Sequence, residues 1–277
     1  MSQAPYAVRG IRSGTRYGVD QKMEDTLAHA LVDQHPKPMP MGITAENLAE
    51  KHSISREQCD AYAESSQKRW AAANEAGRFK EEIIPIILKT RKGEETFDTD
   101  EGPRPQTTAQ SLAKLKPVFI KETGTVTAGN ASGISDGAAS LVIASSDAVK
   151  ANSLTPLARI VSWHYCGVEP SVMGIGPVPA IQGALEKAGL TLADMRLVEV
   201  NEAFSAQYLA VEKELGLDRE ITNTNGGAIA LGHPLGASGA RILTHLVYEL
   251  KRVGGGYAVG AACIGGGQGV AVVLQSC

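Results

Sequence analysis

The sequence predicts a protein of the α/β class, preceded along the chain by a charged α+β region. Strand-like and helix-like segments alternate after residue 150. The chain has 30 glycines, where an average usage of ~7% would give about 19, and many of them separate these segments. Residues 1–125 hold 36 of the 57 charged residues but only 8 of the glycines. The charged region and the glycine-rich layer therefore have different roles.

The sequence of residues 1–125 predicts exposed helices and a hairpin. Three prolines within residues 35–42 predict a loop, because proline blocks helix. Thr44 begins a predicted short helix to residue 52, and a second helix begins at Ser55, where the S-x-x-Q spacing is that of a capping box. Its apolar stripe runs from Cys59 to Trp70, and Gly77 ends it. Residues 83–90 and 95–99 predict a hairpin joined by a glycine turn.

The second region predicts a layered unit. Apolar runs at 140–145, 157–165, 197–201, 257–263 and 269–275 predict strands, and 177–187, 202–215 and 236–252 predict helices. The last two strands are separated only by IGGGQ, which favours an antiparallel pair.

Length and charge limit the class of protein. A chain of 277 residues suggests about two domains. Its net charge of −3 provides no basic surplus for nucleic acid or an anionic membrane. No run approaches the ~20 apolar residues of a membrane span, and residues 1–14 contain no targeting signal.

The cysteines do not form a recognisable framework. Their spacing lacks CxxC and Cys/His patterns, so neither disulfides nor a metal site is indicated; they are Cys59, Cys166, Cys263 and Cys277. A reducing compartment is the default expectation.

His233 lies in a glycine-rich loop, residues 223–239, and is followed by Pro234. The bared backbone would allow its imidazole to stand close to a ligand. The alternative is a capping loop in which the glycines only satisfy turn geometry, and the density of glycine around one titratable group favours the functional interpretation.

Cys263 ends an apolar strand and precedes three glycines. Its thiol would lie where backbone N–H groups can bind an oxyanion, although a strand-end cysteine can also be a small buried hydrophobe. A phosphate-binding loop is disfavoured because no Gly-Lys-Ser/Thr follows.

Asn201 follows the strand at 197–201 and precedes a helix. It is either a helix N-cap or an amide that holds a water or an oxyanion, and the spacing does not choose between them.

These residues resemble those of the thiolases, most closely the mitochondrial type of 3-ketoacyl-CoA thiolase. The resemblance rests on long motifs that extend over the whole chain, namely MGITAEN at 41–47, RPQTT at 104–108, GNASGISDGAA at 129–139, NEAF at 201–204, NxxGGxxAxGHPxGxSG at 223–239 and CIGGGQG at 263–269.

The resemblance implies a five-layered αβαβα fold of two similar halves with an inserted loop domain. Residues 1–125 would be the loop domain, which covers the active site and binds coenzyme A. Residues 126–150 would be the closing strand and helix of the N-terminal half, and 151–277 the C-terminal half. It also implies a homo-oligomer, a dimer or tetramer, in mitochondria.

The same resemblance implies a role for each motif residue. His233 would activate the nucleophilic thiol and bind the thioester oxygen, Cys263 would be the acid/base, Asn201 would hold a water of the oxyanion site, and the Gly265 N–H would serve a second oxyanion hole. The residues expected to contact coenzyme A, a substrate rather than a resident cofactor, are Arg104, Thr107 and Ser132. Met39 and Met41 would border the acyl pocket.

The implied activity is acyl transfer, the cleavage of 3-ketoacyl-CoA by coenzyme A in fatty-acid β-oxidation and the reverse condensation. The family's nucleophilic cysteine lies in a Cys-Gly-Ser-Gly-like motif of the N-terminal third, which would precede residue 1, so the chain alone is expected to be inactive. The alternative is a catalytically silent protein that binds coenzyme A or another subunit. A ketoacyl synthase is disfavoured, since it has a second histidine where Cys263 stands.

Overall fold

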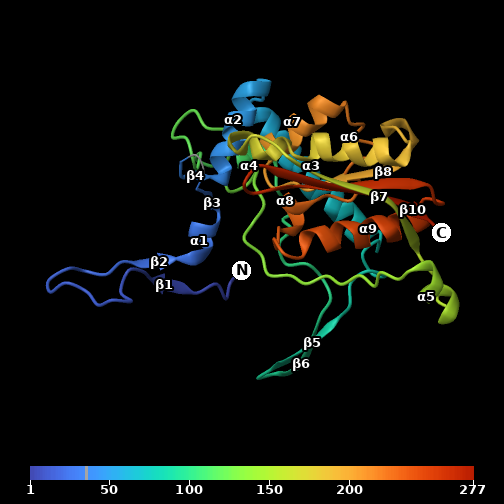
Figure 1. Ribbon diagram of the computed structural model, residues 1–277, viewed down its shortest axis with the longest axis horizontal. Coiled ribbons are helices and arrows are strands. Elements are labelled where there is room, and N and C mark those ends of the chain that lie inside the picture. The colour runs from blue at the N-terminus through green and yellow to red at the C-terminus, as the bar shows by residue number, and fades with distance from the viewer. Residues whose placement is uncertain (35–36) are drawn as a thin grey trace.

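A four-stranded mixed sheet lies at the centre of the computed structural model, which describes residues 1–34 and 37–277 (Figure 1). Its strand order is β7-β10-β9-β8. The strands are β7 (Ala158–Gly167), β8 (Met195–Val200), β9 (Tyr257–Ile264) and β10 (Gln268–Ser276). β9 and β10 pair antiparallel, which confirms the prediction, whereas β8 and β9 run parallel.

Helices cover both faces of this sheet. The helices α6 (Pro177–Ala188) and α9 (Ser238–Arg252) lie above and below the strands in Figure 1. Alternate residues of one strand point to opposite faces. Thus Val259 of β9 joins the core that includes α6, and Ala258 joins the core that includes Leu250 of α9. The described residues therefore form an α/β/α arrangement, three of the five layers expected for the whole αβαβα fold.

Shorter elements connect these layers. The 3-10 helices η1 (Pro170–Ile175) and η2 (Leu192–Asp194) precede α6 and β8, and the helices α7 (Ser205–Leu215) and α8 (Ala228–Leu231) follow β8. The predicted helix at 202–215 begins three residues later because residues 201–204 instead form the loop that leads out of the sheet.

Two helices of the charged region pack on this layered unit. They are α2 (Met41–His52) and α3 (Arg56–Glu75). The capping box of Ser55 and Gln58 is present, and the predicted stripe from Cys59 to Trp70 is buried, so both predictions are confirmed. The helix predicted from Thr44 begins earlier, at Met41.

The remaining elements of the charged region are short. The strands form three separate hairpins: β1 (Tyr6–Val8) with β2 (Met23–Asp25), β3 (Val32–Asp33) with β4 (Met39–Pro40), and β5 (Ile86–Thr90) with β6 (Gly93–Phe97). The β5–β6 pair confirms the predicted hairpin. The short helices are α1 (Thr26–Ala30), α4 (Ala109–Leu112) and α5 (Ser146–Ala151). Both long hairpins project from the body (Figure 1).

Two local predictions were wrong. Residues 140–145 form no strand, because no other strand of the described residues lies beside them to accept their hydrogen bonds. Val142 is 92% exposed there. The predicted loop at 35–42 contains β4 and the first residues of α2, while residues 35–36 lie outside the described residues.

Candidate active site

The parallel pair β8–β9 brings two of the predicted site residues to one edge of the sheet. Val200 pairs with Ala261, and the Asn201 N–H donates to the Ala261 carbonyl at 2.9 Å. Cys263 lies two residues farther along β9. Because the carboxyl ends of parallel strands meet at one edge, this edge is where α/β proteins commonly bind ligands.

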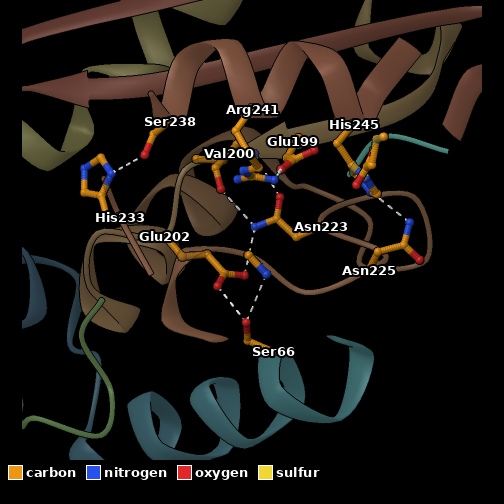
Figure 2. A network of polar contacts seen from close by, with 12 residues as sticks. Ser66, Glu199, Val200, Glu202, Asn223, Asn225, His233, Ser238, Arg241 and His245 are labelled. Atoms are coloured by element: carbon orange, nitrogen blue, oxygen red, sulfur yellow. Dashed lines mark hydrogen bonds and ion pairs between the residues drawn. The ribbon is translucent and has the colours of Figure 1, made fainter. Parts of the chain in front are cut away.

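Both ring nitrogens of His233 contact polar side chains, and Figure 2 shows the contact with Ser238. Its Nδ1 lies 2.6 Å from the Ser238 Oγ, and its Nε2 lies 3.2 Å from the Asn201 Nδ2. The Ser238 hydroxyl donates to the Pro234 carbonyl at 3.1 Å, so the same oxygen accepts the hydrogen bond from Nδ1–H. The Nε2 lone pair consequently faces the Asn201 amide.

The His233 imidazole is neutral at physiological pH. Burial, and secondarily the positive charge of Arg241, lower its pKa to about 4. A neutral imidazole can accept a proton from a thiol.

Asn201 is not a helix cap. The following helix, α7, begins at Ser205 and its N-cap is Phe204. The Asn201 side chain instead contacts His233, and its Oδ1 is buried without a hydrogen-bond partner among the described residues. An orphaned buried acceptor beside an imidazole suits an amide that holds a water.

The loop at 263–269, which begins with Cys263, contacts the charged region at Met41 and Asp33. A Cβ at Gly265 would lie 2.3 Å from the Met41 Cε, so the end of the Met41 side chain packs directly on the Gly265 backbone. The Gly266 N–H donates to the Asp33 carboxylate at 2.9 Å. Burial raises the pKa of the Cys263 thiol to about 12, so Cys263 is protonated at neutral pH.

Ser132 and its neighbour Gly133 lie between the loop at 201–204 and the histidine loop at 223–239. The Ser132 N–H and Oγ both donate to the Ala203 carbonyl, at 3.0 and 3.1 Å. The next residue, Gly133, accepts a hydrogen bond from the His233 N–H at 3.4 Å. The segment therefore joins the NEAF loop to the histidine loop.

Arg104 and Thr107 share one turn beside α3. The Thr107 N–H donates to the Arg104 carbonyl at 2.9 Å, and the Arg104 N–H donates to the Gln67 side chain at 2.7 Å. Gln67 also donates to the Ile229 carbonyl of α8 at 3.3 Å. The Arg104 guanidinium is exposed and makes no hydrogen bond or ion pair within residues 1–34 and 37–277. The backbone thus places this turn near α8, with the guanidinium facing solvent.

Glu202, for which the sequence predicted no role, is fully buried and accepts hydrogen bonds at both carboxylate oxygens. Its donors are the Tyr62 hydroxyl (2.7 Å), the Asn223 amide (3.1 Å), the Ser66 hydroxyl (2.7 Å) and the Ile229 N–H (3.2 Å). This carboxylate joins α3 to the loops on either side of the site. A glutamate directly after Asn201, at the end of an apolar strand, was the available signal.

The sequence also predicted no individual role for Asn223 or Ser238, although both lie in the motif at 223–239. Asn223 exchanges two hydrogen bonds of 2.9 Å with the backbone of Val200, which fixes the strand end before Asn201. The spacing of Ser238 five residues after His233 carried no signal, because the loop must fold back before the two side chains meet.

The described residues contain neither a candidate metal site nor a candidate membrane span. In that part of the chain, no group of three or more His, Cys, Asp or Glu side chains is placed to hold a metal ion. No helix within the same ranges has the length and apolar character to cross a membrane.

Known proteins share this whole arrangement. The family model of the thiolase N-terminal domain matches residues 1–147, and that of the thiolase C-terminal domain matches residues 154–276. Human mitochondrial 3-ketoacyl-CoA thiolase is 65% identical over 276 residues, which are 100% of this chain and 69% of that protein. Acetyl-CoA acetyltransferase of Pseudomonas aeruginosa is 53% identical, over 99% of this chain and 70% of its own length.

Solved structures agree with the sequence comparisons. The crystal structure of human mitochondrial 3-ketoacyl-CoA thiolase matches with a TM-score of 0.94 at 62% identity, covering 100% of this chain and 69% of that one. The same human enzyme in complex with CoA matches with a TM-score of 0.93 at 61% identity, covering 100% of this chain and 68% of that one. This chain belongs to the thiolase family and has the mixed α/β thiolase fold.

Proposed function

We propose that this chain carries the enolate-forming part of an acetyl-CoA C-acyltransferase. The reaction is thiolysis of a 3-ketoacyl-CoA to acetyl-CoA and a shortened acyl-CoA, and the reverse condensation, in mitochondrial fatty-acid β-oxidation. The observation that carries the proposal is the Asn201–His233–Ser238 chain of contacts at the sheet edge where Cys263 ends β9. The mitochondrial relative supports the compartment.

In thiolysis, the thiolate of an acyl-accepting cysteine bonds to the 3-keto carbon, the bond between that carbon and the α-carbon breaks, and the electron pair of the broken bond goes to the acetyl-CoA enolate. The acyl group then passes from that cysteine to the thiolate of coenzyme A. The water held by Asn201 donates to the enolate oxygen, and so does the His233 Nε2–H once that nitrogen has taken the proton of the acyl-accepting thiol, since charge develops on this oxygen. The Cys263 S–H delivers its proton to the α-carbon, and the incoming coenzyme A thiol returns a proton to the Cys263 thiolate. The high pKa of Cys263 keeps the proton available for this step. The Gly265 N–H serves a second oxyanion hole.

The coenzyme A portion is held by Arg104, Thr107 and Ser132. Arg104 presents an exposed guanidinium suited to phosphate, and Ser132 lies beside the histidine loop. A relative's structure in complex with CoA supports this ligand class. We assign residues 1–125 to the loop domain, 126–150 to the end of the N-terminal half and 151–277 to the C-terminal half, in a homo-oligomer.

The chain alone is expected to lack thiolytic turnover. A nucleophilic thiol needs a lowered pKa, whereas burial raises the pKa of Cys59 and Cys263 to about 12 and also raises that of Cys166. Cys277 is the exposed last residue. We therefore assign the acyl-accepting cysteine to a segment outside these 277 residues.

Hydrogen exchange tests the enolate step without the nucleophile. The chain should bind coenzyme A in calorimetry and should exchange the methyl protons of acetyl-CoA with deuterium from D2O, detected by mass spectrometry. Exchange requires the Cys263 thiolate, so its rate should rise as the pH rises from 7 toward about 12. Cys263→Ser should slow exchange by at least about 100-fold.

Cys166→Ser is the matched control. Cys166 and Cys263 pair with the same residue, Gly269, from opposite sides of β10. The control should exchange at the unsubstituted rate. Binding of coenzyme A without exchange would support the silent binding protein instead, and absence of binding would contradict both functions.

A further inference from the structure

The turn between β9 and β10 consists of three glycines, Gly265, Gly266 and Gly267. Gly266 and Gly267 have positive φ angles of 82° and 80°. Glycine adopts such conformations without a steric cost, so a turn of this composition has several accessible arrangements. Contacts from side chains outside the three glycines therefore decide which arrangement the turn adopts.

Two side chains hold the peptide unit between Gly265 and Gly266. The Gly266 N–H donates to the Asp33 carboxylate at 2.9 Å, and the Gly265 carbonyl accepts from the Gln268 Nε2 at 3.1 Å. The N–H and C=O of a trans peptide unit lie in one plane and point in opposite directions, so these two bonds oppose a rotation of the whole unit. Asp33 and Gln268 together form a peptide clamp on the turn.

Asp33 reaches the turn from a hairpin that is anchored in the core. It is the last residue of β3, which pairs with β4. Directly after β4, the Met41 N–H donates to the Leu31 carbonyl at 3.0 Å. Met41 also begins α2, whose Leu48 is fully buried, and the end of its side chain packs on Gly265. The core packing of α2 thus sets the position of Asp33 relative to the turn.

The peptide clamp leaves the preceding N–H available to a ligand. In the described part of the chain, the Gly265 N–H donates to no backbone or side-chain acceptor. It belongs to the peptide unit between Ile264 and Gly265, and Ile264 pairs with Gln268 across the β9–β10 hairpin. The direction of the Gly265 N–H is therefore fixed by strand pairing on one side and by the peptide clamp on the other.

We propose that Asp33 is a positioning residue of the thiolase site, whose carboxylate holds the peptide unit after Gly265 so that the Gly265 N–H stays directed at the carbonyl oxygen of the acyl group. This inference rests on the function proposed above, in which the Gly265 N–H serves the second oxyanion hole. A donor fixed in place before the reaction stabilises developing negative charge without having to reorient. Asp33 acts through the backbone of the turn.

Amide hydrogen exchange tests the peptide clamp in the absence of any ligand. In the 277-residue chain with isotopically labelled glycines, NMR gives the exchange rate of the Gly266 N–H with water. Asp33→Ala should raise that rate by about 10-fold, the factor expected for the loss of one hydrogen bond. Asp33→Asn should keep most of the protection, because its amide oxygen also accepts a hydrogen bond.

Asp218→Ala is the matched control, because the Asp218 carboxylate also accepts a backbone N–H, that of Glu220, at 2.9 Å. This variant should leave the exchange of Gly266 unchanged. No acceleration in D33A would mean that the carboxylate does not hold the turn, and an equal acceleration in D218A would mean that loss of any such aspartate loosens the fold. Either result overturns the proposal.

A ligand tests the consequence for Gly265. Acetoacetyl-CoA, a 3-ketoacyl-CoA, should shift the amide proton resonance of Gly265 downfield in the unsubstituted chain and in D33N, and should shift it less in D33A. An equal shift in D33A overturns the positioning role, and the absence of a shift in all three proteins contradicts the second oxyanion hole and the positioning role with it. Deuterium exchange of acetyl-CoA depends on Cys263, so failure of the proposed enolate step is distinguishable from failure of this inference.

Discussion

The regions before and after residue 150 differ in how they bury their apolar side chains. The second region closes one sheet between helices, and its cores contain fully buried side chains such as Ile181, Val259 and Leu250. Among its described residues, the strands of the first region form only two-stranded sheets, and apolar side chains such as Tyr17, Ile84 and Val142 lie in solvent. Its two longest helices, α2 and α3, pack on the second region. The first region thus depends on the second for its core, while both contribute to the site.

The largest effect is expected where the two regions meet, at Glu202. Glu202→Ala should lower the free energy of unfolding by about 3–5 kcal/mol, because several buried donors from both regions lose their acceptor, each costing roughly 1–3 kcal/mol. Urea denaturation at pH 7 measures this. Glu220→Ala, at an exposed glutamate, is the control. Equal losses in the two variants would mean that the regions are not joined through this carboxylate.

Truncation of apolar side chains compares the regions directly. Leu250→Ala should cost about 2–5 kcal/mol, because it opens a cavity beneath α9. Val142→Ala should change the free energy of unfolding by less than about 0.5 kcal/mol, since its side chain is exposed. The same urea titrations supply both values. A large loss from Val142→Ala would show that residues 140–145 are covered in solution, and would break the comparison.

The smallest expected effect is a dependence of stability on pH. The pKa of His233 is about 4 in the folded chain, below the ordinary value of 6.5 for histidine. The unfolded chain therefore binds a proton first as the pH falls. The stability associated with neutral His233 is complete above about pH 6.5 and is lost as the pH falls toward 4, by up to about 3 kcal/mol.

His233→Gln removes this titration. Thermal unfolding between pH 4 and pH 7 should show a steeper decline for the unsubstituted chain than for the variant. Parallel curves for the two proteins would mean that His233 is not buried in neutral form.

Local patterns gave much of the secondary structure. The capping box at Ser55, the stripe on α3, the hairpin at residues 86–97 and the antiparallel β9–β10 pair depend on neighbouring residues, and all are present. The strand predicted at 140–145 failed because pairing requires a partner that an apolar run does not specify. The start of α2 differed: the helix begins at Met41, directly after Pro40, and Gly42 in its first turn is buried.

The sequence by itself determined the thiolase family, the mixed α/β class and the loops that carry Asn201, His233 and Cys263, because these lie in continuous motifs. Only the tertiary structure decided which side chains meet: Ser238 with the His233 Nδ1, Glu202 with α3, and Arg241 with Glu199. The reason is physical. Hydrogen bonds and ion pairs between distant segments depend on where strands and helices are packed, and burial then sets which protonation state each group holds.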